Sequence, residues 1–460
     1  MHMLNVDVYG PVFRTVLLPT WESVIRRRPT LTHLEELERT EWRSLDQLHA
    51  LQSAALKRLM RHAYDNVPFY RERFDAAGIS PDAIAGPEDL AALPVLTRSD
   101  ASASLEARKS KAPPYFEISK MTSGTTGEPL EFGYDRGSEY WRQATKLRGY
   151  GWAGYRPGDK SLHYWGMLEA LYKKPLLTRS KIKADRLMRR ENFIDCTERS
   201  DERLKGVVQA IRELRPKVLV SYSQAAVALA RYVLETGSRS WDVLPVICAA
   251  EALFAPDRKL VEAAFGAVFE TYGSREFMLI AAECDAHDGM HLSMENLIVE
   301  LLVRENGGLR AARPGELGEI AVTDLHNYGL PFIRYLTGDL GLQAGSERCK
   351  CGRGLAKLAA VQGRKTDTMR DGQGQPVSGL FFHVTFSVLA HKIRQFQAVQ
   401  RRDGSVDLRL VPNRSYDDSV LEIVRKSSAK FLPGVDVRIE LVPEIPPGKN
   451  GKLRTVVVET

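Results

Sequence analysis

Three hydroxyl side chains and two glycines lie within five consecutive residues of the stretch Lys-Met-Thr-Ser-Gly-Thr-Thr-Gly-Glu-Pro, which spans residues 120–129. Such a loop can turn tightly, because glycine tolerates positive φ, and it can direct backbone N–H groups and hydroxyls at one anion. An ordinary polar surface loop has the same composition. No Lys-Ser or Lys-Thr pair follows the second glycine, so a Walker P-loop is not supported. The candidate anion-binding residues are Ser123, Gly124, Thr125, Thr126 and Gly127.

Four residues offer a different chemistry, the binding of a metal ion. Cys284 is followed by His291, and Cys349 and Cys351 form a Cys-x-Cys pair further along the chain. Three thiolates and one imidazole make up a tetrahedral zinc set, and zinc in such a set would be structural. The alternative is a group of buried or loosely exposed cysteines without a metal. A catalytic cysteine is disfavoured, because no activating base is evident.

The composition is that of a soluble globular protein with more than one domain: 460 residues, 43% hydrophobic and 27% charged. The formal net charge of +7 suits anionic ligands such as nucleotides or CoA, and no nucleic-acid-binding motif is recognised. Five cysteines favour a reducing compartment, with Cys196 and Cys248 as small core residues. The sequence shows no secretory signal pattern and no apolar run of about 18 residues, so we expect a cytoplasmic protein without a transmembrane segment.

Helical and strand patterns alternate over the first half of the chain. Apolar residues at helical spacing predict a helix from Ser44 to about Phe74, which Pro68 would end early. Strands separated by helices indicate βαβ units and a mostly parallel sheet, so the predicted fold class is α/β. The predicted strands cover residues 160–165, 217–222 and 243–249, and the predicted helices cover residues 142–147, 203–214 and 224–234.

The pattern changes in the second half of the chain. Strands dominate from about Glu300, with Gly and Pro between them, and a smaller unit begins after Gly363 and contains predicted strands at 435–439 and 456–458. We therefore expect a large N-terminal domain over residues 1–363 and a small α+β domain over residues 364–460.

Four further motifs follow the loop in a fixed order. They are Glu-Thr-Tyr-Gly-Ser-Arg-Glu at 270–276, Ile-Arg-Tyr-Leu-Thr-Gly-Asp at 333–339, Gly-Arg-Lys-Thr-Asp at 363–367 and Pro-Pro-Gly-Lys-Asn-Gly-Lys-Leu-Arg at 446–454. Together with the loop, they resemble the ordered motifs of the adenylate-forming superfamily, and in particular its phenylacetate-CoA ligase and CapK-like branch. The resemblance covers nearly the whole chain. Each motif alone is a weak signal, whereas the order of all of them is a strong one.

The resemblance implies an enzyme that joins a carboxylic acid to the α-phosphate of ATP, releases pyrophosphate and then transfers the acyl group. CoA would be the acceptor by analogy with the ligases, and an amine or hydroxyl of a small molecule or saccharide is the alternative. The implied cofactors are ATP/AMP, Mg²⁺, structural zinc and CoA. A non-catalytic nucleotide-binding protein is a rival of another class. The acid, the acceptor and the oligomeric state, for which a homodimer is one alternative, stay open.

The same resemblance assigns roles around the nucleotide. Residues 123–127 would bind the β- and γ-phosphates, although Leu130 stands where many members have lysine. Tyr272 and Gly273 would pack on the adenine, with Ser274 near the ligand. Glu276 would hold Mg²⁺. Arg275, where threonine is usual, would either stabilise the α-phosphate or point away into an ion pair.

Further roles fall on residues outside the Tyr-Gly motif. Asp339 would accept hydrogen bonds from both ribose hydroxyls, a pairing that suits a carboxylate and a cis-diol. Arg364 would contact the ribose or a phosphate, and Arg334 would support the site or pair with an acid. Ala250 and Glu251 would wall the adenine or merely end a strand and cap a helix. Lys452 would be the catalytic lysine of a mobile small domain, with Lys449 as its competitor.

Three segments keep two or more interpretations. The N-terminal arm, with the basic run Arg26–Arg28, is expected to cover the domain, and a membrane contact is the alternative. The basic stretch from Lys173 to Arg190 is a solvated face, or else it contacts an acidic partner, a membrane surface or CoA. Aromatic residues at 163–166 and 221–224 indicate a pocket for an aryl or bulky acyl group, or else belong to the core.

Overall fold

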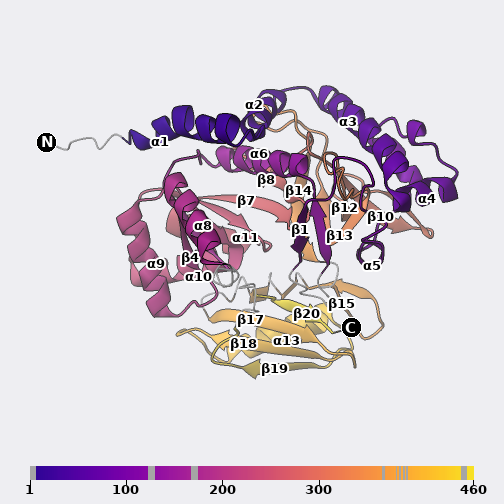
Figure 1. Cartoon of the computed structure of the whole chain (residues 1–460). Helices are drawn as coiled ribbons and strands as arrows, with labels where there is room; N and C mark the ends of the chain where they lie inside the picture. The colour runs from indigo at the N-terminus through magenta and orange to yellow at the C-terminus, as the bar shows by residue number, and fades with distance from the viewer. Residues whose placement is uncertain are drawn as a thin grey trace.

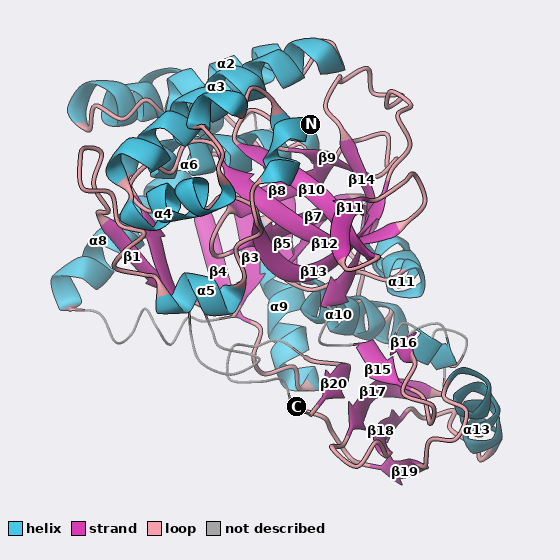
Figure 2. Ribbon diagram, turned by 90° about the vertical axis from the view of Figure 1, so that its right-hand side faces the viewer, coloured by secondary structure: helices cyan, strands magenta, loops and turns pink. Residues whose placement is uncertain are grey.

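The structure is a computed structural model in which a large domain with one long sheet carries a small domain at one side (Figures 1 and 2). It describes residues 7–459, except residues 123–129, 167–174, 365–367, 380, 383–384, 387–388, 390–391 and 447–452. The predicted phosphate-binding residues 123–127 and the predicted catalytic Lys452 therefore lie outside the described residues, as does Lys449.

A sheet of 12 strands forms the centre of the large domain, in the order β11-β10-β12-β13-β14-β9-β8-β7-β6-β5-β3-β4. Its parallel part confirms the predicted βαβ units and consists of β3 (Ser161–Trp165), β4 (Glu191–Asp195), β5 (Val218–Tyr222), β6 (Leu244–Ala249) and β7 (Gly266–Ser274). The other strands pair antiparallel: β8 (Met278–Glu283), β9 (Met290–Leu292), β10 (Leu297–Glu305), β11 (Gly308–Ala311), β12 (Leu317–Asp324), β13 (Tyr335–Gln343) and β14 (Lys357–Arg364). The fold class is α/β, as predicted, but the expectation of a mostly parallel sheet is wrong: the sheet is mixed, because β8 to β14 pair antiparallel with their neighbours.

Helices cover both faces of the parallel strands, and every residue of β5 is consequently buried. Leu219 packs with the helices of one face, whereas Val218 and Val220 pack with α6 (Arg136–Trp152) on the other. Successive side chains of a strand point to opposite faces, which explains the continuous apolar run in this segment. The helices of the first face are α9 (Asp201–Leu214), α10 (Ser223–Thr236) and α11 (Ala255–Phe265). The three helical segments predicted from the sequence lie inside α6, α9 and α10.

A layer of helices lies over the large domain on the side away from the small domain (Figure 1). Helix α3 (Leu45–Asn66) begins at Ser44, whose hydroxyl accepts the N–H of Gln47 while the Gln47 side chain accepts the N–H of Ser44. Because α3 ends at Asn66 and α4 begins at Pro68, the predicted interruption by this proline is confirmed. The other elements before the sheet are α1 (Tyr9–Val12), the π-helices η1 (Phe13–Leu17) and η2 (Thr20–Ile25), α2 (Thr30–Thr40), α4 (Pro68–Ala77), the 3₁₀ helices η3 (Pro81–Ala83) and η4 (Pro87–Ala92), and α5 (Arg98–Ala103).

A separate hairpin carries the predicted phosphate-binding loop. Its strands β1 (Ile118–Met121) and β2 (Glu131–Tyr134) pair antiparallel, with Met121 opposite Glu131. The loop between them therefore starts and ends at paired strands, which fixes its two ends.

The small domain has its own core and its own sheet, in the order β19-β18-β17-β20. Its helix α13 packs on this sheet through Val420 and Val424. The elements are β15 (Thr368–Arg370), β16 (Pro376–Ser378), β17 (Ile393–Gln400), β18 (Val406–Pro412), α13 (Ser419–Phe431), β19 (Val437–Leu441) and β20 (Val456–Val458). The predicted strand at 456–458 coincides with β20, and the one at 435–439 is shifted by two residues relative to β19.

Candidate active site

The carboxyl ends of the parallel strands meet at one edge of the large sheet. Trp165, Tyr222 and Ala249 are the last residues of β3, β5 and β6. In open α/β sheets, ligands bind in the crevice outside the carboxyl ends of the strands. The small domain contacts the large domain at the same edge, because the N–H of Leu453 donates to Glu251 directly after β6. A ligand at this edge would therefore lie between the two domains.

Two predicted nucleotide-binding residues that lie far apart in the sequence are hydrogen-bonded here. The Tyr272 hydroxyl donates to Oδ2 of Asp339 over 2.9 Å and lies 3.4 Å from Oγ1 of Thr337. Burial, together with the neighbouring Asp339 carboxylate, raises the pKa of Tyr272 well above its usual value, so the hydroxyl keeps its proton and acts as a donor. On the adjacent strand β14, Arg364 pairs with Asp339 through the backbone register. The structure therefore brings Tyr272, Asp339 and the Arg364 backbone together.

The two residues after Tyr272 have local structural roles of their own. A Cβ atom added to Gly273 would lie 1.8 Å from the carbonyl oxygen of Met278, so glycine is required for the close pairing of β7 and β8. The Ser274 hydroxyl accepts the N–H of Phe277 over 3.3 Å and so stabilises the turn between these strands. This turn holds Glu276 and therefore sets where its carboxylate lies.

Arg275 reaches the hairpin that carries the predicted phosphate-binding loop. Its guanidinium donates to the carbonyl oxygen of Met121, the last residue of β1, over 2.7 Å. At the same place, Arg98 donates to the hydroxyl of Thr122 over 2.9 Å, and that hydroxyl also accepts the N–H of Leu130 over 2.9 Å. Two arginines thus hold the base of the loop against the body of the domain. Sequence reasoning had weighed an α-phosphate contact or an ion pair for Arg275, and this backbone contact was not among them.

The backbone of Glu276 is held by a buried arginine that the sequence alone did not single out. Arg142, in the middle of α6, donates to the carbonyl oxygen of Glu276 and forms an ion pair of 2.5 Å with Asp324. Both charged side chains are almost completely buried, and the Arg142 guanidinium lies 4.2 Å from the centre of the Tyr134 ring. In the sequence, Arg142 is one polar residue of a helix, and Glu276 and Asp324 lie 134 and 182 residues away from it.

The Glu251 carboxylate joins the two domains. Its Oε2 accepts the N–H of Gln224 at the start of α10, and its Oε1 accepts the N–H of Leu453 from the small domain, each over 3.0 Å. The Ser223 hydroxyl donates to the Glu251 carbonyl oxygen over 2.7 Å, and Ala250 has a φ of +71° that turns the chain sharply after β6. Glu251 therefore satisfies an N–H group in the first turn of α10. The contact with the residue that follows Lys452 was not predicted.

Comparison with known proteins shows which proteins the chain resembles. The CapK C-terminal domain family matches residues 370–459. A phenylacetate-coenzyme A ligase from Thermus thermophilus is 26% identical over 443 residues, which cover 90% of this chain and 96% of that protein, and one from Escherichia coli is 29% identical over 73% of this chain and 75% of its own length. Over most of its length the chain is thus similar to phenylacetate-coenzyme A ligases, and its C-terminal part resembles the CapK C-terminal domain.

A solved adenylate-forming enzyme has the same fold. The crystal structure of 2-hydroxyisobutyryl-CoA ligase in the postadenylation state, in complex with R3-HIB-AMP, aligns with a TM-score of 0.72 and covers 92% of both chains at 21% identity. The superposition covers both domains, since 92% of this chain cannot be matched without the small domain.

Arg334, in one of the superfamily motifs, pairs with an acid. Its guanidinium forms an ion pair of 2.9 Å with Glu300 and also donates to the carbonyl oxygens of Ala91 and Leu93. Arg334 is only 3% exposed. Its buried contacts therefore hold the start of the strand that leads to Asp339. Of the two roles predicted for Arg334, the pairing role is the one observed.

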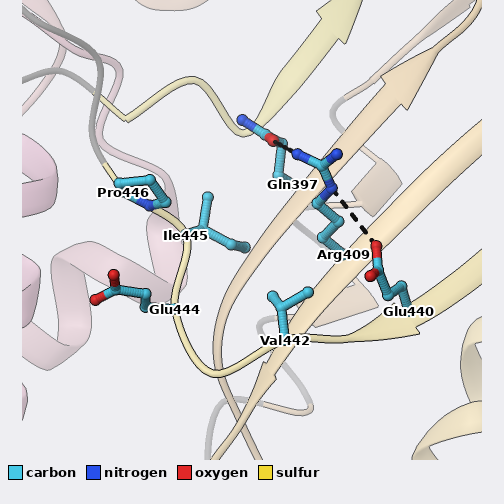
Figure 3. A pocket seen from close by; sticks show the side chains of 7 residues that line it. All are labelled: Gln397, Arg409, Glu440, Val442, Glu444, Ile445 and Pro446. Atoms are coloured by element: carbon cyan, nitrogen blue, oxygen red, sulfur yellow. Dashed lines mark hydrogen bonds and ion pairs between the residues drawn. The ribbon is translucent and has the colours of Figure 1, made fainter.

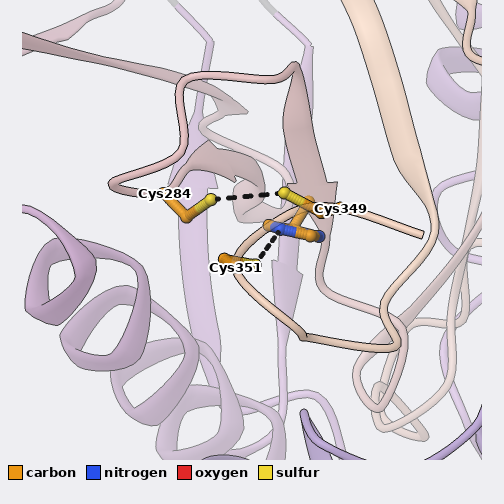
Figure 4. Close-up of side chains that lie close together, drawn as sticks. Cys284, Cys349 and Cys351 are labelled. Carbon is orange, nitrogen blue, oxygen red and sulfur yellow. Dashed lines mark hydrogen bonds between the residues drawn. The ribbon is translucent and has the colours of Figure 1, made fainter.

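The four predicted metal ligands lie together, and Figure 4 shows the three cysteines among them. Cys284 follows β8, His291 is in β9, and Cys349 and Cys351 lie in the loop between β13 and β14. One possible ligand atom from each residue lies within 4.8 Å of the others. Sγ of Cys284 is 3.7 Å from Sγ of Cys349, and Sγ of Cys351 is 3.3 Å from Nε2 of His291. The predicted grouping of the four residues is confirmed.

The histidine of the cluster is in the form that ligates a metal. Burial lowers the pKa of His291 to about 4, so the imidazole is neutral. Its Nδ1 lies 3.2 Å from the carbonyl oxygen of Leu355, which assigns the N–H to Nδ1 and leaves Nε2 as the free lone pair that faces Cys351. This donor set fits a tetrahedral zinc ion.

The aromatic residues considered for an acyl pocket pack into the core of the parallel sheet. Tyr164 and Tyr222 are both buried in this core, which agrees with the core alternative for these residues. Trp165 packs against it, and the ring centres of Trp165 and Tyr222 lie 4.5 Å apart at the strand ends. His163 stacks on Phe193 at 4.4 Å, and burial lowers its pKa to about 3, which keeps it neutral.

A groove of about 340 Å³ lies in the small domain, with Ile445 and Pro446 in its wall (Figure 3). Its one cation, Arg409, lies 3.7 Å from Glu440 and 3.5 Å from the Gln397 side-chain oxygen. With Glu444 also in the wall, the groove does not favour a phosphate. The Gln397 amide donates to the carbonyl oxygen of Arg454 over 2.9 Å and so holds the chain just after Lys452. The remaining lining residues are Val442, Ile445 and Pro446.

Glu270, two residues before Tyr272, is expected to make the stability of the folded protein depend on pH. Burial, together with the nearby Glu283 carboxylate, raises the pKa of Glu270 from 4.5 to about 7. The folded state therefore holds this proton more tightly than the unfolded state, and its stability falls as pH rises from 4.5 to 7. We expect Glu270→Gln to melt at a higher temperature than the unsubstituted protein at pH 8, by an amount equivalent to about 3 kcal/mol or less, and to lose this advantage at pH 5. Thermal melts at both pH values test this, and an equal difference at pH 5 and pH 8 would contradict it.

Proposed function

We propose that this protein is an ATP-dependent, AMP-forming acid–CoA ligase. It would join a carboxylic acid to the α-phosphate of ATP with release of pyrophosphate, and then transfer the acyl group from AMP to the thiol of CoA. The observation that carries the proposal is the hydrogen bond between Tyr272 and Asp339 at the edge where the two domains meet. It unites two motifs that belong to the nucleotide site of this superfamily, and the relatives named above are themselves CoA ligases.

In this proposal, Asp339 binds the ribose. Its carboxylate would accept hydrogen bonds from the ribose diol, while the protonated Tyr272 hydroxyl fixes its orientation. The Tyr272 ring and Gly273 would lie against the adenine, together with Ala250 and Glu251 after β6. Arg364, on the strand paired with Asp339, would contact the ribose or a phosphate.

The phosphates would be bound at the hairpin. Hydroxyls and N–H groups of residues 123–127 would hold the β- and γ-phosphates, because the loop starts from a base fixed by Arg98 and Arg275. Glu276 would be the protein ligand of Mg²⁺, which supplies charge neutralisation when bound. The contact between Arg142 and the Glu276 carbonyl oxygen would hold this carboxylate in place before the substrates arrive.

The small domain would supply Lys452 for the first step. Its ammonium group would reach the carboxylate and the α-phosphate, where negative charges repel each other. The hydrogen bond from the adjacent Leu453 to Glu251 supports this, since it holds the neighbouring backbone at the strand ends. We place the domain boundary between residues 363 and 364 and the hinge at 364–370, where β14 of the large sheet ends and β15 begins. Rotation about this hinge would remove Lys452 and admit the acceptor.

The acceptor has one specific alternative. The match of residues 370–459 to the CapK C-terminal domain favours an amine or hydroxyl of a small molecule or saccharide as a second candidate. Adenylation would be the same in both cases, and only the attacking nucleophile would differ.

ATP–pyrophosphate exchange with aryl, fatty, hydroxy and amino acids tests the proposal. Exchange that depends on one class of acid is expected, followed by release of AMP when CoA is added. Amines and sugars offered in place of CoA then test the alternative acceptor. If no acid supports exchange while ATP still binds, the proposal fails and a non-catalytic nucleotide-binding role replaces it.

We also propose that Cys284, His291, Cys349 and Cys351 bind one structural zinc ion. Zinc would join β8 and β9 to the loop between β13 and β14, and β13 carries Asp339. Protein purified without any chelator is expected to contain about one equivalent of zinc. The variant Cys351→Ala is expected to contain less than about a tenth of an equivalent. Cys196→Ala is the matched control, because this thiol is buried in the core away from the cluster. Elemental analysis decides, and zinc-free unsubstituted protein would refute the proposal.

A further inference from the structure

The exposed apolar side chains of this protein are concentrated on one part of its surface. Among the described residues, 19 large apolar side chains are strongly exposed, and ten of them belong to the N-terminal arm (residues 7–28) or to α8 (Leu176–Arg189). We call this region the arm–α8 surface. Its exposed apolar members are Val8, Tyr9, Val12, Val16, Leu17, Val24, Ile25, Leu176, Leu177 and Leu187.

Polar contacts hold the arm and α8 together as one surface. The Tyr9 hydroxyl donates to the carbonyl oxygen of Met188 over 2.6 Å, and Arg189 pairs with Glu22 over 3.0 Å. Just after the helix, Arg190 pairs with Asp7 over 2.8 Å. These contacts, with the buried side chain of Phe13, confirm that the arm lies on the large domain (Figure 1). Its outer apolar side chains stay exposed.

Helix α8 has the composition of an interfacial helix. None of its 14 residues is buried, and the side chains of Leu176, Leu177 and Leu187 are 74%, 79% and 78% exposed. At 100° per residue these leucines lie within about a third of the helix circumference, and Lys181 and Lys183 border them on either side. An exposed leucine side chain forgoes the favourable transfer of its apolar surface out of water, so a partner that covers these leucines gains affinity.

The charge of the same surface is strongly positive. Residues 7–28 and 175–190 contain ten Arg and Lys against three Asp and Glu, an excess of seven. This equals the formal net charge of the whole chain, so the other residues balance to zero. A second copy of the chain is a poor partner, because a two-fold interface would bring the same cations face to face. An anionic surface is complementary to them.

We propose that the arm–α8 surface docks this protein on an anionic lipid bilayer. The leucines and valines would enter the boundary between headgroups and acyl chains, while the lysines and arginines would lie at the lipid phosphates. Binding would be peripheral, because no helix in the described part of the chain is long and apolar enough to cross a bilayer. The proposal does not depend on the adenylation chemistry.

Co-sedimentation of the full chain with vesicles tests the proposal. Vesicles with about one-third phosphatidylglycerol in phosphatidylcholine are expected to bind the protein at low salt and to release it as salt rises. The variant Leu176→Ser/Leu177→Ser/Leu187→Ser is expected to bind at least about tenfold more weakly, and Lys181→Glu/Lys183→Glu similarly. Ile423→Ser/Leu441→Ser, which removes two exposed apolar side chains of the small domain, is the matched control and should bind like the unsubstituted protein.

Several outcomes would overturn the proposal. One is failure of the unsubstituted protein to bind the anionic vesicles at low salt, and another is equal loss in the control variant. Light scattering supplies a third: if the leucine variant converts a dimer to a monomer and vesicle binding is unchanged, a second copy covers this surface. Melting curves show whether each variant is folded, and the substituted residues of α8 are exposed, so we expect unchanged melting.

Discussion

Replacement of Lys452 by alanine is expected to lower the rate of acyl-adenylate formation by about 10²–10³-fold, with little change in ATP affinity. The reason is that one ammonium group, placed where negative charge gathers between the carboxylate and the α-phosphate, acts on the transition state more than on bound ATP. Pyrophosphate exchange measures the rate, and equilibrium binding of ATP measures the affinity.

The chain offers a matched control for this prediction. Lys449 lies three residues earlier in the same basic segment, so Lys449→Ala removes the same charge without removing the proposed catalytic group. It should retain most of the exchange rate. Acyl-adenylate supplied to Lys452→Ala together with CoA should still give thioester, because the second step would not use this lysine. If Lys449→Ala loses exchange and Lys452→Ala keeps it, the two roles are reversed.

The second large effect is expected at Arg142. Arg142→Met leaves Asp324 buried without its partner, and loss of one member of a buried ion pair costs about 3–5 kcal/mol of stability. It also frees the carbonyl oxygen of Glu276, which should raise the Mg²⁺ concentration needed for half-maximal exchange. Urea unfolding and Mg²⁺ titration of the exchange rate measure the two effects separately.

A double variant distinguishes the two roles of Arg142. In Arg142→Met/Asp324→Asn, the unpaired buried charge is gone, so much of the stability should return. The Glu276 carbonyl oxygen still lacks its donor, so the Mg²⁺ requirement should stay high. If Mg²⁺ dependence recovers together with stability, Arg142 acts on stability alone and does not position Glu276.

The elements of the parallel sheet could be predicted, because their signals are local. The apolar run at 217–222 becomes a strand buried on both faces, and Pro68 interrupts the helix that began at Ser44. Such patterns depend on neighbouring residues and on backbone geometry, which a sequence displays directly. The spacing of the Cys-x-Cys pair also indicated metal binding, and the structure places Cys284 and His291 beside this pair.

The sequence by itself determined the order of the superfamily motifs, the α/β class and the residue types available for nucleotide and metal. Only the tertiary structure decided how distant residues meet: Tyr272 with Asp339, Arg142 with Glu276 and Asp324, and Leu453 with Glu251. It also decided that Phe13 and Leu18 of the arm are buried, while other apolar side chains of the arm stay exposed beside those of α8. The physical reason is that a hydrogen bond or ion pair depends on positions in space, whereas the partners lie between 67 and 202 residues apart in the chain.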